Sequence, residues 1–148
     1  MSELYLGVDP GKSGALAIVD DAGKYVDCVR FSETENDVVV WLDKWKGNVS
    51  YAFLEKVHSM PKQGVSSSFR FGALYGFCKG ILVSSGIPWE ECPPQKWMKF
   101  LGCSTGGDKN VTKQFAQRLH PGVKVIHANA DALLIAEYCR RMRKFLKV

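Results

Sequence analysis

Apolar residues in the first third of the chain fall into short runs separated by turn residues. The segments 4–8 (LYLGV), 14–19 (GALAIV) and 24–31 (KYVDCVRF) have the length and composition of strands. Aspartates and a glycine at 20–23 separate the second run from the third, which is typical of a hairpin. The pattern therefore predicts that the chain begins with three antiparallel strands.

The rest of the chain alternates between helical and strand-like patterns. Further strands are predicted over 50–54 and 87–92. Helices are predicted from a cap at Asn36 or Asp37 to Trp45, and over 66–85, 94–101, 109–119 and from about Asn129 onward. Within 66–85, the buried stripe is expected to hold Phe69, Ala73, Phe77 and Ile81 or Leu82. This order favours an α/β fold with a mixed sheet, as one domain over residues 1–148.

Composition excludes several classes of protein. The chain is 46% hydrophobic, which is too apolar for a disordered chain, and no window approaches the roughly 20 apolar residues of a membrane span. Its start, MSELYLGVDPGKSG, does not have the pattern of a signal peptide. The five cysteines include no C-x-x-C pair, so reduced thiols are favoured over disulfides or a zinc knuckle. We therefore expect a cytoplasmic protein without a membrane partner.

Charge is distributed unevenly along the chain. The net charge is +5, yet residues 1–55 carry five basic and ten acidic residues. Residues 56–118 carry nine basic and three acidic residues, and residues 140–148 hold five cations and no anion. A basic middle and tail favour a polyanionic partner, although a solubilising charged surface would have the same composition.

Three acidic residues stand at the ends of apolar elements. Asp9 follows the first strand between Gly7 and Gly11, Glu55 ends the fourth strand, and Asp131 lies in the first turn of an apolar helix. Asp9 also suits a plain turn, and Asp131 suits the positive end of a helix dipole. If the three meet, each pair repels by about 4 kcal/mol at 4 Å and an effective dielectric of 20, so a proton or a cation must bind. Carboxylate oxygens favour Mg²⁺ or Mn²⁺, and two such ions suit phosphodiester hydrolysis.

Four motifs in sequence order resemble those of a known family. In order, they are GVDPGKSGALAIVD, FLEKVHSMPKQGVSSSFRFGALYG, PPQKWMKFLG with GDKNVTKQFAQRLHP, and HANADALLIAEYCRR. Together these motifs resemble those of the RuvC-type Holliday-junction resolvases, particularly phage-encoded members. These belong to the RNase H-like (retroviral integrase) superfamily. The resemblance implies a mixed five-stranded sheet with helices on both faces. It also implies a metal-dependent endonuclease that acts as a homodimer on four-way DNA, uses no nucleotide cofactor, and lies in the host cytoplasm if phage-encoded.

The resemblance also implies roles for individual residues. Asp9, Glu55 and Asp131 match the metal-binding acids of the family, which suggests two Mg²⁺ or Mn²⁺ ions per site. Lys109 matches a lysine near the scissile phosphate, and Lys113 and Arg118 continue its basic helix. The predicted reaction is symmetric hydrolysis of phosphodiesters across the junction by an activated water.

The chain departs from the family pattern at two positions. The family places a fourth metal-binding Asp or His three residues before the last Asp, and here that position is Ala128. Three interpretations stay open: an engineered Asp→Ala change that disables cleavage, replacement of that ligand by His127, and a natural loss of cleavage. The second departure is Met98, where related sequences have lysine, so Lys96 or Lys99 is expected to serve instead.

The segment after Glu55 is expected to contact DNA. Glycine and serines allow close approach of the backbone to phosphates, and Phe69 is interpreted either as core or as a wedge at the opened junction centre. His58 is interpreted as a loop histidine. The predicted DNA contacts are Lys12, Ser13, Lys62, Ser68, Phe69, Arg70, Lys96, Lys99 and Lys113.

Other functions remain as alternatives. A non-catalytic junction-binding protein would account for Ala128. An actin-like or sugar-kinase-like ATP-binding domain also opens with Asp-x-Gly-x-x-Gly, but that fold needs two such domains and a second phosphate loop. A nuclease with a broader range of branched DNA, or of RNA–DNA hybrids, would have the same basic middle segment.

Overall fold

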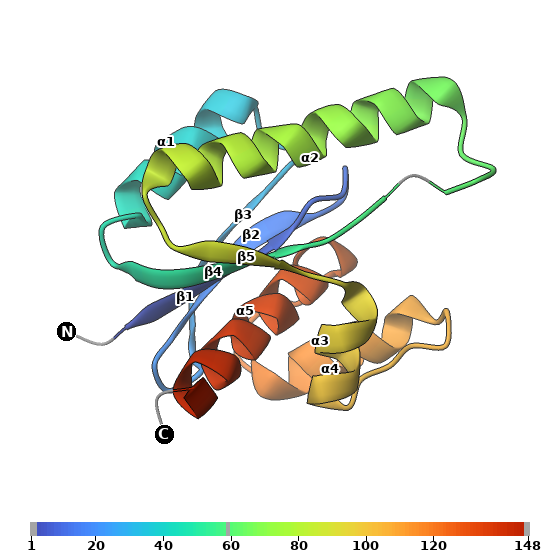
Figure 1. Cartoon of the computed structure of the whole chain (residues 1–148). Helices are drawn as coiled ribbons and strands as arrows, with labels where there is room; N and C mark the ends of the chain where they lie inside the picture. Colours follow the sequence, from blue (N-terminus) through green and yellow to red (C-terminus); the bar gives the residue numbers. More distant parts are fainter. Residues whose placement is uncertain (1–2, 59, 147–148) are drawn as a thin grey trace.

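The computed structural model describes residues 3–58 and 60–146 as a five-stranded sheet between two layers of helices (Figure 1). The strand order is β3-β2-β1-β4-β5, with β1–β2 and β2–β3 antiparallel and β1–β4 and β4–β5 parallel. This confirms the predicted mixed sheet and its three antiparallel strands. The strands are β1 (Leu4–Asp9), β2 (Ala15–Asp20), β3 (Tyr25–Arg30), β4 (Val49–Glu55) and β5 (Trp89–Cys92).

Helices cover both faces of the sheet, as the resemblance implied. One face carries α1 (Glu35–Trp45) and α2 (Val65–Ser85) (Figure 1). The other carries α3 (Pro94–Leu101), α4 (Lys109–Leu119) and α5 (His127–Leu146). Because side chains alternate along a strand, β1 and β2 supply both cores. Leu6, Val8, Leu16 and Ile18 pack toward α1 and α2, whereas Tyr5, Ala15, Ala17 and Val19 pack toward α5.

On the first helical face, one local prediction was wrong and a second was wrong in part. The N-cap of α1 is Thr34, whose hydroxyl accepts the Asp37 backbone N–H at 3.1 Å, rather than Asn36 or Asp37. In α2 the buried residues are Cys78, Ile81 and Leu82, while Phe69 is 78% exposed. The expected stripe is confirmed at Ile81 and Leu82 but is wrong at Phe69 and Ala73, which are exposed. Because α2 carries apolar residues around most of its circumference, spacing alone does not select the buried face. The interpretation of Phe69 as core is therefore incorrect.

Helix α5 lies directly on β1 because of one glycine. A Cβ on Gly7 would collide with the backbone of Ala132 and Ala136, so only glycine permits this approach. The helix begins at His127, two residues earlier than expected. Its early start and close contact bring the first turns of α5 to the end of β1.

The basic tail is only partly available to a partner. Arg140 and Arg141 both donate to the buried carboxylate of Glu137 at 2.6 Å, and Lys144 pairs with Asp21 at 3.0 Å. These three cations of the basic tail are therefore paired with acidic residues of the same chain. Lys147 lies outside the described residues.

Two expectations from composition can be compared with the structure. All five cysteines lie in the described ranges, and all are free thiols. Among the described residues, no helix has the length and apolar content needed to cross a bilayer.

Candidate active site

The three acidic residues singled out in the sequence line one pocket. Asp9 is the last residue of β1 and Glu55 the last of β4, and these strands are parallel neighbours, so their carboxyl ends share one edge of the sheet. Asp131, on α5, faces the same space. The cavity measures about 430 Å³ and is also lined by Lys12, Ser13, Lys109, Thr112 and His127. Three acids that are remote in sequence therefore converge.

A tight turn after β1 shapes one wall of this pocket. The Gly14 N–H donates to the Gly11 carbonyl at 2.9 Å, and a Cβ on Gly14 would collide with the carbonyl of Asp9. The Gly11 N–H donates to the Asp9 carboxylate. The side chains of Lys12 and Ser13 are exposed at the pocket rim. The turn thus fixes Asp9 and presents one cation and one hydroxyl beside it.

Glu55 is held by a tryptophan from α3. The Trp97 indole N–H donates to Glu55 Oε2 at 2.8 Å, and Trp97 has no exposed surface. Helix α3 begins at Pro94 directly after β5, which is the parallel neighbour of β4, so Trp97 reaches the end of β4. A buried donor of this kind fixes the orientation of the carboxylate.

Asp131 is surrounded by groups from α4 and from its own helix. It makes a side-chain hydrogen bond with Thr112, which is 4% exposed, and it interacts electrostatically with Lys109 and His127. Lys109 is the first residue of α4, after the predicted cap Asp108, which accepts the Asn110 N–H at 2.9 Å. The cap therefore sets where the Lys109 side chain leaves the helix.

Burial raises the pKa of all three acids, and repulsion from neighbouring carboxylates raises it further for Asp9 and Glu55. For Asp9 the causes are burial, then the charges of Glu55 and Asp131, and the pKa lies well above its usual range. Burial raises the pKa of Glu55 to about 7, against the lowering effect of the Trp97 hydrogen bond. Burial also raises the pKa of Asp131, although Thr112, Lys109 and His127 lower it. Three carboxyl groups therefore share a pocket whose lining also holds two lysines, Lys12 and Lys109.

Ala128 and its two neighbours at the start of α5 have different surroundings. Ala128 is 7% exposed, and His127 rather than Ala128 lines the pocket. Asn129 is structural: its Oδ1 accepts the Ile126 N–H at 2.9 Å, and its Nδ2 donates to the Lys124 carbonyl at 3.4 Å. Of the two polar neighbours of Ala128, only His127 lies at the acids.

The predicted DNA contacts fall on two separate surfaces. Lys12 and Arg70 line a mainly apolar cavity of about 490 Å³ beside the acid pocket, with Gln63, Ser67, Phe71 and Leu74. Lys62 and Phe69 are exposed and Ser68 is half-buried at the start of α2. Lys96 and Lys99 do not line the acid pocket and instead border an apolar cavity between α3 and α5. Lys113 and His58 do not line the acid pocket either.

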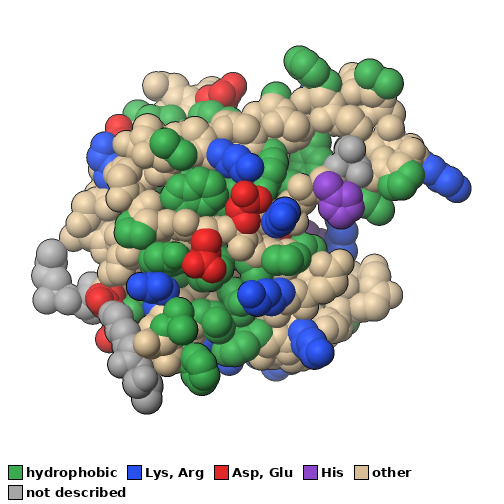
Figure 2. All heavy atoms as spheres, in the orientation of Figure 1, with side chains coloured by type: hydrophobic (Ala, Val, Ile, Leu, Met, Phe, Trp, Pro, Cys, Tyr) green, Lys and Arg blue, Asp and Glu red, His purple; other side chains and the backbone are tan. Residues whose placement is uncertain are grey.

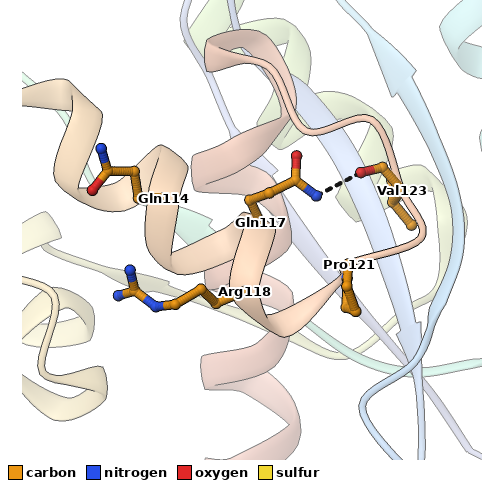
Figure 3. A pocket seen from close by; sticks show the side chains of 5 residues that line it. All are labelled: Gln114, Gln117, Arg118, Pro121 and Val123. Carbon is orange, nitrogen blue, oxygen red and sulfur yellow. Dashed lines mark hydrogen bonds between the residues drawn. The ribbon is translucent and has the colours of Figure 1, made fainter.

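A larger cavity, of about 570 Å³, lies at the far end of α4 (Figure 3). Its lining holds no acidic residue. Gln117 donates to the carbonyls of His120 and Val123, at 3.0 and 2.7 Å, and fastens the loop before α5. We interpret this region as structural support for the start of α5.

Sequence reasoning missed Trp97 and Thr112, which hold Glu55 and Asp131. A signal existed for Trp97, because a tryptophan inside a short helix flanked by lysines is an anchor of the core. Nothing in the sequence marks Thr112, since its partner lies on another helix.

The chain was also compared with known proteins. No protein-family model matches it, and no curated protein matches its sequence. Among solved structures, a complex of RuvC from Thermus thermophilus with a Holliday junction substrate matches with a TM-score of 0.62 and 15% identity. A second Thermus thermophilus RuvC structure matches with a TM-score of 0.61 and 16% identity, and each match covers 95% of this chain and 96% of the other. The chain therefore has the fold of RuvC, a mixed five-stranded RNase H-like sheet with helices on both faces.

Proposed function

We propose that the protein is a metal-dependent endonuclease that cleaves four-way and related branched DNA. One observation carries this proposal: Asp9, Glu55 and Asp131 line a single pocket at the carboxyl edge of the sheet. Their raised pKa values reflect the burial of carboxyl groups close to one another, and a bound cation would stabilise their charged forms. The RuvC fold supports the substrate, because one matching structure is a complex with a Holliday junction.

The donor set fits a hard divalent cation. Among the described residues, no group of three or more His, Cys, Asp or Glu side chains is arranged so that it would hold a metal ion by itself. Mg²⁺ does not need such a cage, since it is commonly bound by one or two carboxylates with waters and substrate phosphates. We propose that the three acids, with His127 at the rim, hold two Mg²⁺ or Mn²⁺ ions when DNA is present. When bound, such ions supply water activation and stabilise charge on the phosphate oxygens.

The protein's own groups perform the positioning and electrostatic part of the reaction. Trp97 and Thr112 hold the carboxylates of Glu55 and Asp131 in fixed orientations. Lys109 is proposed to stabilise negative charge on the scissile phosphate or the leaving oxygen. Lys12 and Ser13 at the rim would bind a neighbouring phosphate, which aligns the strand with the acids.

We propose that a second copy of the chain packs on the exposed face of α2. This helix is apolar around most of its circumference, yet one face lies open, with Val65 90%, Phe69 78% and Val83 68% exposed. Gly72, Gly76 and Gly80 lie on that face at intervals of four residues, and nothing lies within 4 Å of a Cβ built on any of them. Glycines at this spacing allow another helix to approach closely. A two-fold pair would supply two acid pockets for a two-fold DNA substrate.

A gel assay tests the proposed activity. Labelled four-way junction, duplex and RNA–DNA hybrid are incubated with the protein and Mg²⁺, with and without a chelator. We expect symmetric nicks in the junction only with Mg²⁺, loss of nicking in Asp9→Asn with junction binding retained, and normal nicking in Asp37→Asn, an exposed aspartate on α1. Nicking by Asp9→Asn at the rate of the parent protein would refute the proposed site.

A second function is favoured by one residue. If Ala128 removes an essential ligand, the protein binds junctions without cleaving them. In that case the gel assay gives a shifted complex and no product, and an Ala128→Asp variant distinguishes this reading from a wrong assignment of the site.

A further inference from the structure

The cavity between α3 and α5 is apolar and open, and it lies apart from the acid pocket. It measures about 450 Å³ and is lined by Phe100, Tyr138, Met142 and Phe145 together with Lys96 and Lys99. Exposed fractions are 48% for Phe100, 70% for Phe145 and 64% for the neighbouring Leu146. Figure 2 shows hydrophobic side chains gathered over α3 and the C-terminal part of α5, with basic side chains beside them. Large apolar groups gathered in this way on a surface commonly mark a binding site.

The walls of this cavity are preformed. The Phe100 ring meets the Tyr138 ring edge-on at 5.3 Å between centroids, and Tyr138 in turn meets Phe53 of the core at 5.2 Å. Tyr138 is 1% exposed, so the cavity floor is continuous with the packed core. A rigid aromatic floor lowers the entropic cost of binding an apolar side chain.

The cations at the rim lack acidic partners. Among the described residues, neither Lys96 nor Lys99 has a carboxylate within ion-pair distance, whereas Lys144 pairs with Asp21. The guanidinium of Arg143 stacks over the Tyr51 ring at 4.0 Å and also forms no such pair. Glu90 borders the same aromatic groups and keeps its negative charge, because the hydrogen bond it accepts at 2.8 Å comes from the neutral Tyr51 hydroxyl. With Lys96, Lys99 and Arg143 against this one carboxylate, the net charge around the cavity is positive.

We propose that this cavity, defined by Lys96, Lys99, Phe100, Tyr138, Met142 and Phe145, binds a short segment of a partner protein in which acidic residues flank large apolar ones. An apolar side chain of the segment fills the space between Phe100 and Phe145. Carboxylates on either side of it pair with Lys96 and Lys99. DNA fits less well, because the floor offers apolar surface where a phosphate backbone needs donors.

Fluorescence anisotropy with a labelled peptide tests this proposal. The probe contains three aspartates followed by Leu-Leu-Phe with a free carboxyl end, and its control has asparagines in place of the aspartates. We expect the acidic probe to bind in the micromolar range, at least ten-fold more tightly than its control, and more weakly in high salt. Phe145→Ser and Lys99→Glu should each weaken binding at least ten-fold. Val40→Ser and Arg30→Glu, matched changes at exposed positions on other elements, should leave it unchanged.

Three outcomes would overturn the proposal. The first is equal binding of the two peptides or no binding of either. The second is a ten-fold loss of junction binding in both Phe145→Ser and Lys99→Glu, which would assign the cavity to DNA. The third is sedimentation that shows a dimer lost in Phe145→Ser, which would assign it to a second copy. None of these readouts requires cleavage, so the nuclease proposal stands or falls separately.

Discussion

The indole N–H of Trp97 donates to the carboxylate of Glu55 across 42 positions of sequence, at 2.8 Å and out of contact with solvent. The bond joins α3 to the end of β4. It supplies a donor to a carboxylate whose pKa burial has raised to about 7. The orientation of one acid in the pocket therefore depends on a helix that contributes no acid itself.

Replacing Trp97 should impair the site more than it impairs the fold. Trp97→Phe keeps an aromatic ring but leaves Glu55 without its donor, and we expect a stability loss of about 1–3 kcal/mol. The increase in melting temperature caused by Mg²⁺ should fall markedly, and junction nicking should drop by about ten-fold or more. Tyr138→Phe, a buried aromatic that does not contact Glu55, is the control. Equal metal responses in the two variants would contradict the positioning role.

Burial of Glu55 in the acid pocket predicts how stability depends on pH. Because the folded pKa of Glu55 is about 7 and its ordinary value is 4.5, the folded state binds more protons than the unfolded state between these values. Stability therefore falls as pH rises through this window. Without metal, the melting temperature should be lower at pH 8 than at pH 5, and Glu55→Gln should reduce the difference. Glu33→Gln, at an exposed position, should not.

Divalent cations should offset the loss of stability at high pH. Millimolar Mg²⁺ binding to the folded state raises the melting temperature at pH 8 by mass action. The effect should disappear in Asp9→Asn. A similar rise in the parent protein and in Asp9→Asn would show that the ions act elsewhere.

The contact of α5 with β1 predicts a strict requirement for glycine. Gly7→Ala places a methyl group against the backbone of Ala132 and Ala136, where neither the strand nor the helix can yield, and should cost about 3 kcal/mol or more. Gly47→Ala, with nothing within 4 Å of its new Cβ, is the matched control and should be neutral. Urea denaturation measures both.

The open face of α2 predicts that a substitution there can prevent dimer formation without destabilising the monomer. Gly76→Glu adds a side chain where the isolated chain has free space, and glycine is a poor helix former, so monomer stability should be unchanged or improved. A second helix at that face would meet a buried charge. Analytical ultracentrifugation should show a dimer for the parent protein and a monomer for the variant, and a monomeric parent would refute this interface.

Position 128 provides a gain-of-function test. Asp at this position stands one turn before Asp131 on α5, and Ala128→Asp should start or increase nicking if the chain is an inactivated nuclease. His127→Ala then decides whether the rim histidine contributes: its loss should reduce nicking only if His127 serves as the fourth ligand. No change in either variant would exclude both explanations for the departure at this position.

Much of the fold was predictable because strands and turns leave local signals. Neighbouring residues in the sequence were enough to predict three features: the hairpin at residues 20–23, the cap at Asp108, and the acids at the ends of β1 and β4. The buried face of α2 was not predictable, since its apolar residues satisfy two faces and only the packed structure selects one. The pairing of Arg140 and Arg141 with Glu137 escaped prediction because a charge count does not register internal ion pairs.

The same distinction applies to the candidate site. The convergence of three acids followed from their places at strand and helix ends, while their metal-binding role stays a prediction. The roles of Trp97 and Thr112 could not be predicted, because they depend on how α3 and α4 lie over the sheet. No local sequence pattern specifies that arrangement.

Helix α5 carries Asp131 near its start and Phe145 in its last turn, about 21 Å apart at 1.5 Å per residue. Its backbone is interlocked with β1 at Gly7, so it has no freedom to slide along the sheet. A ligand bound at one end of α5 is then not expected to act on the other end by sliding the helix along the sheet. We therefore expect a protein bound in the aromatic cavity to leave the rate of the proposed junction cleavage unchanged.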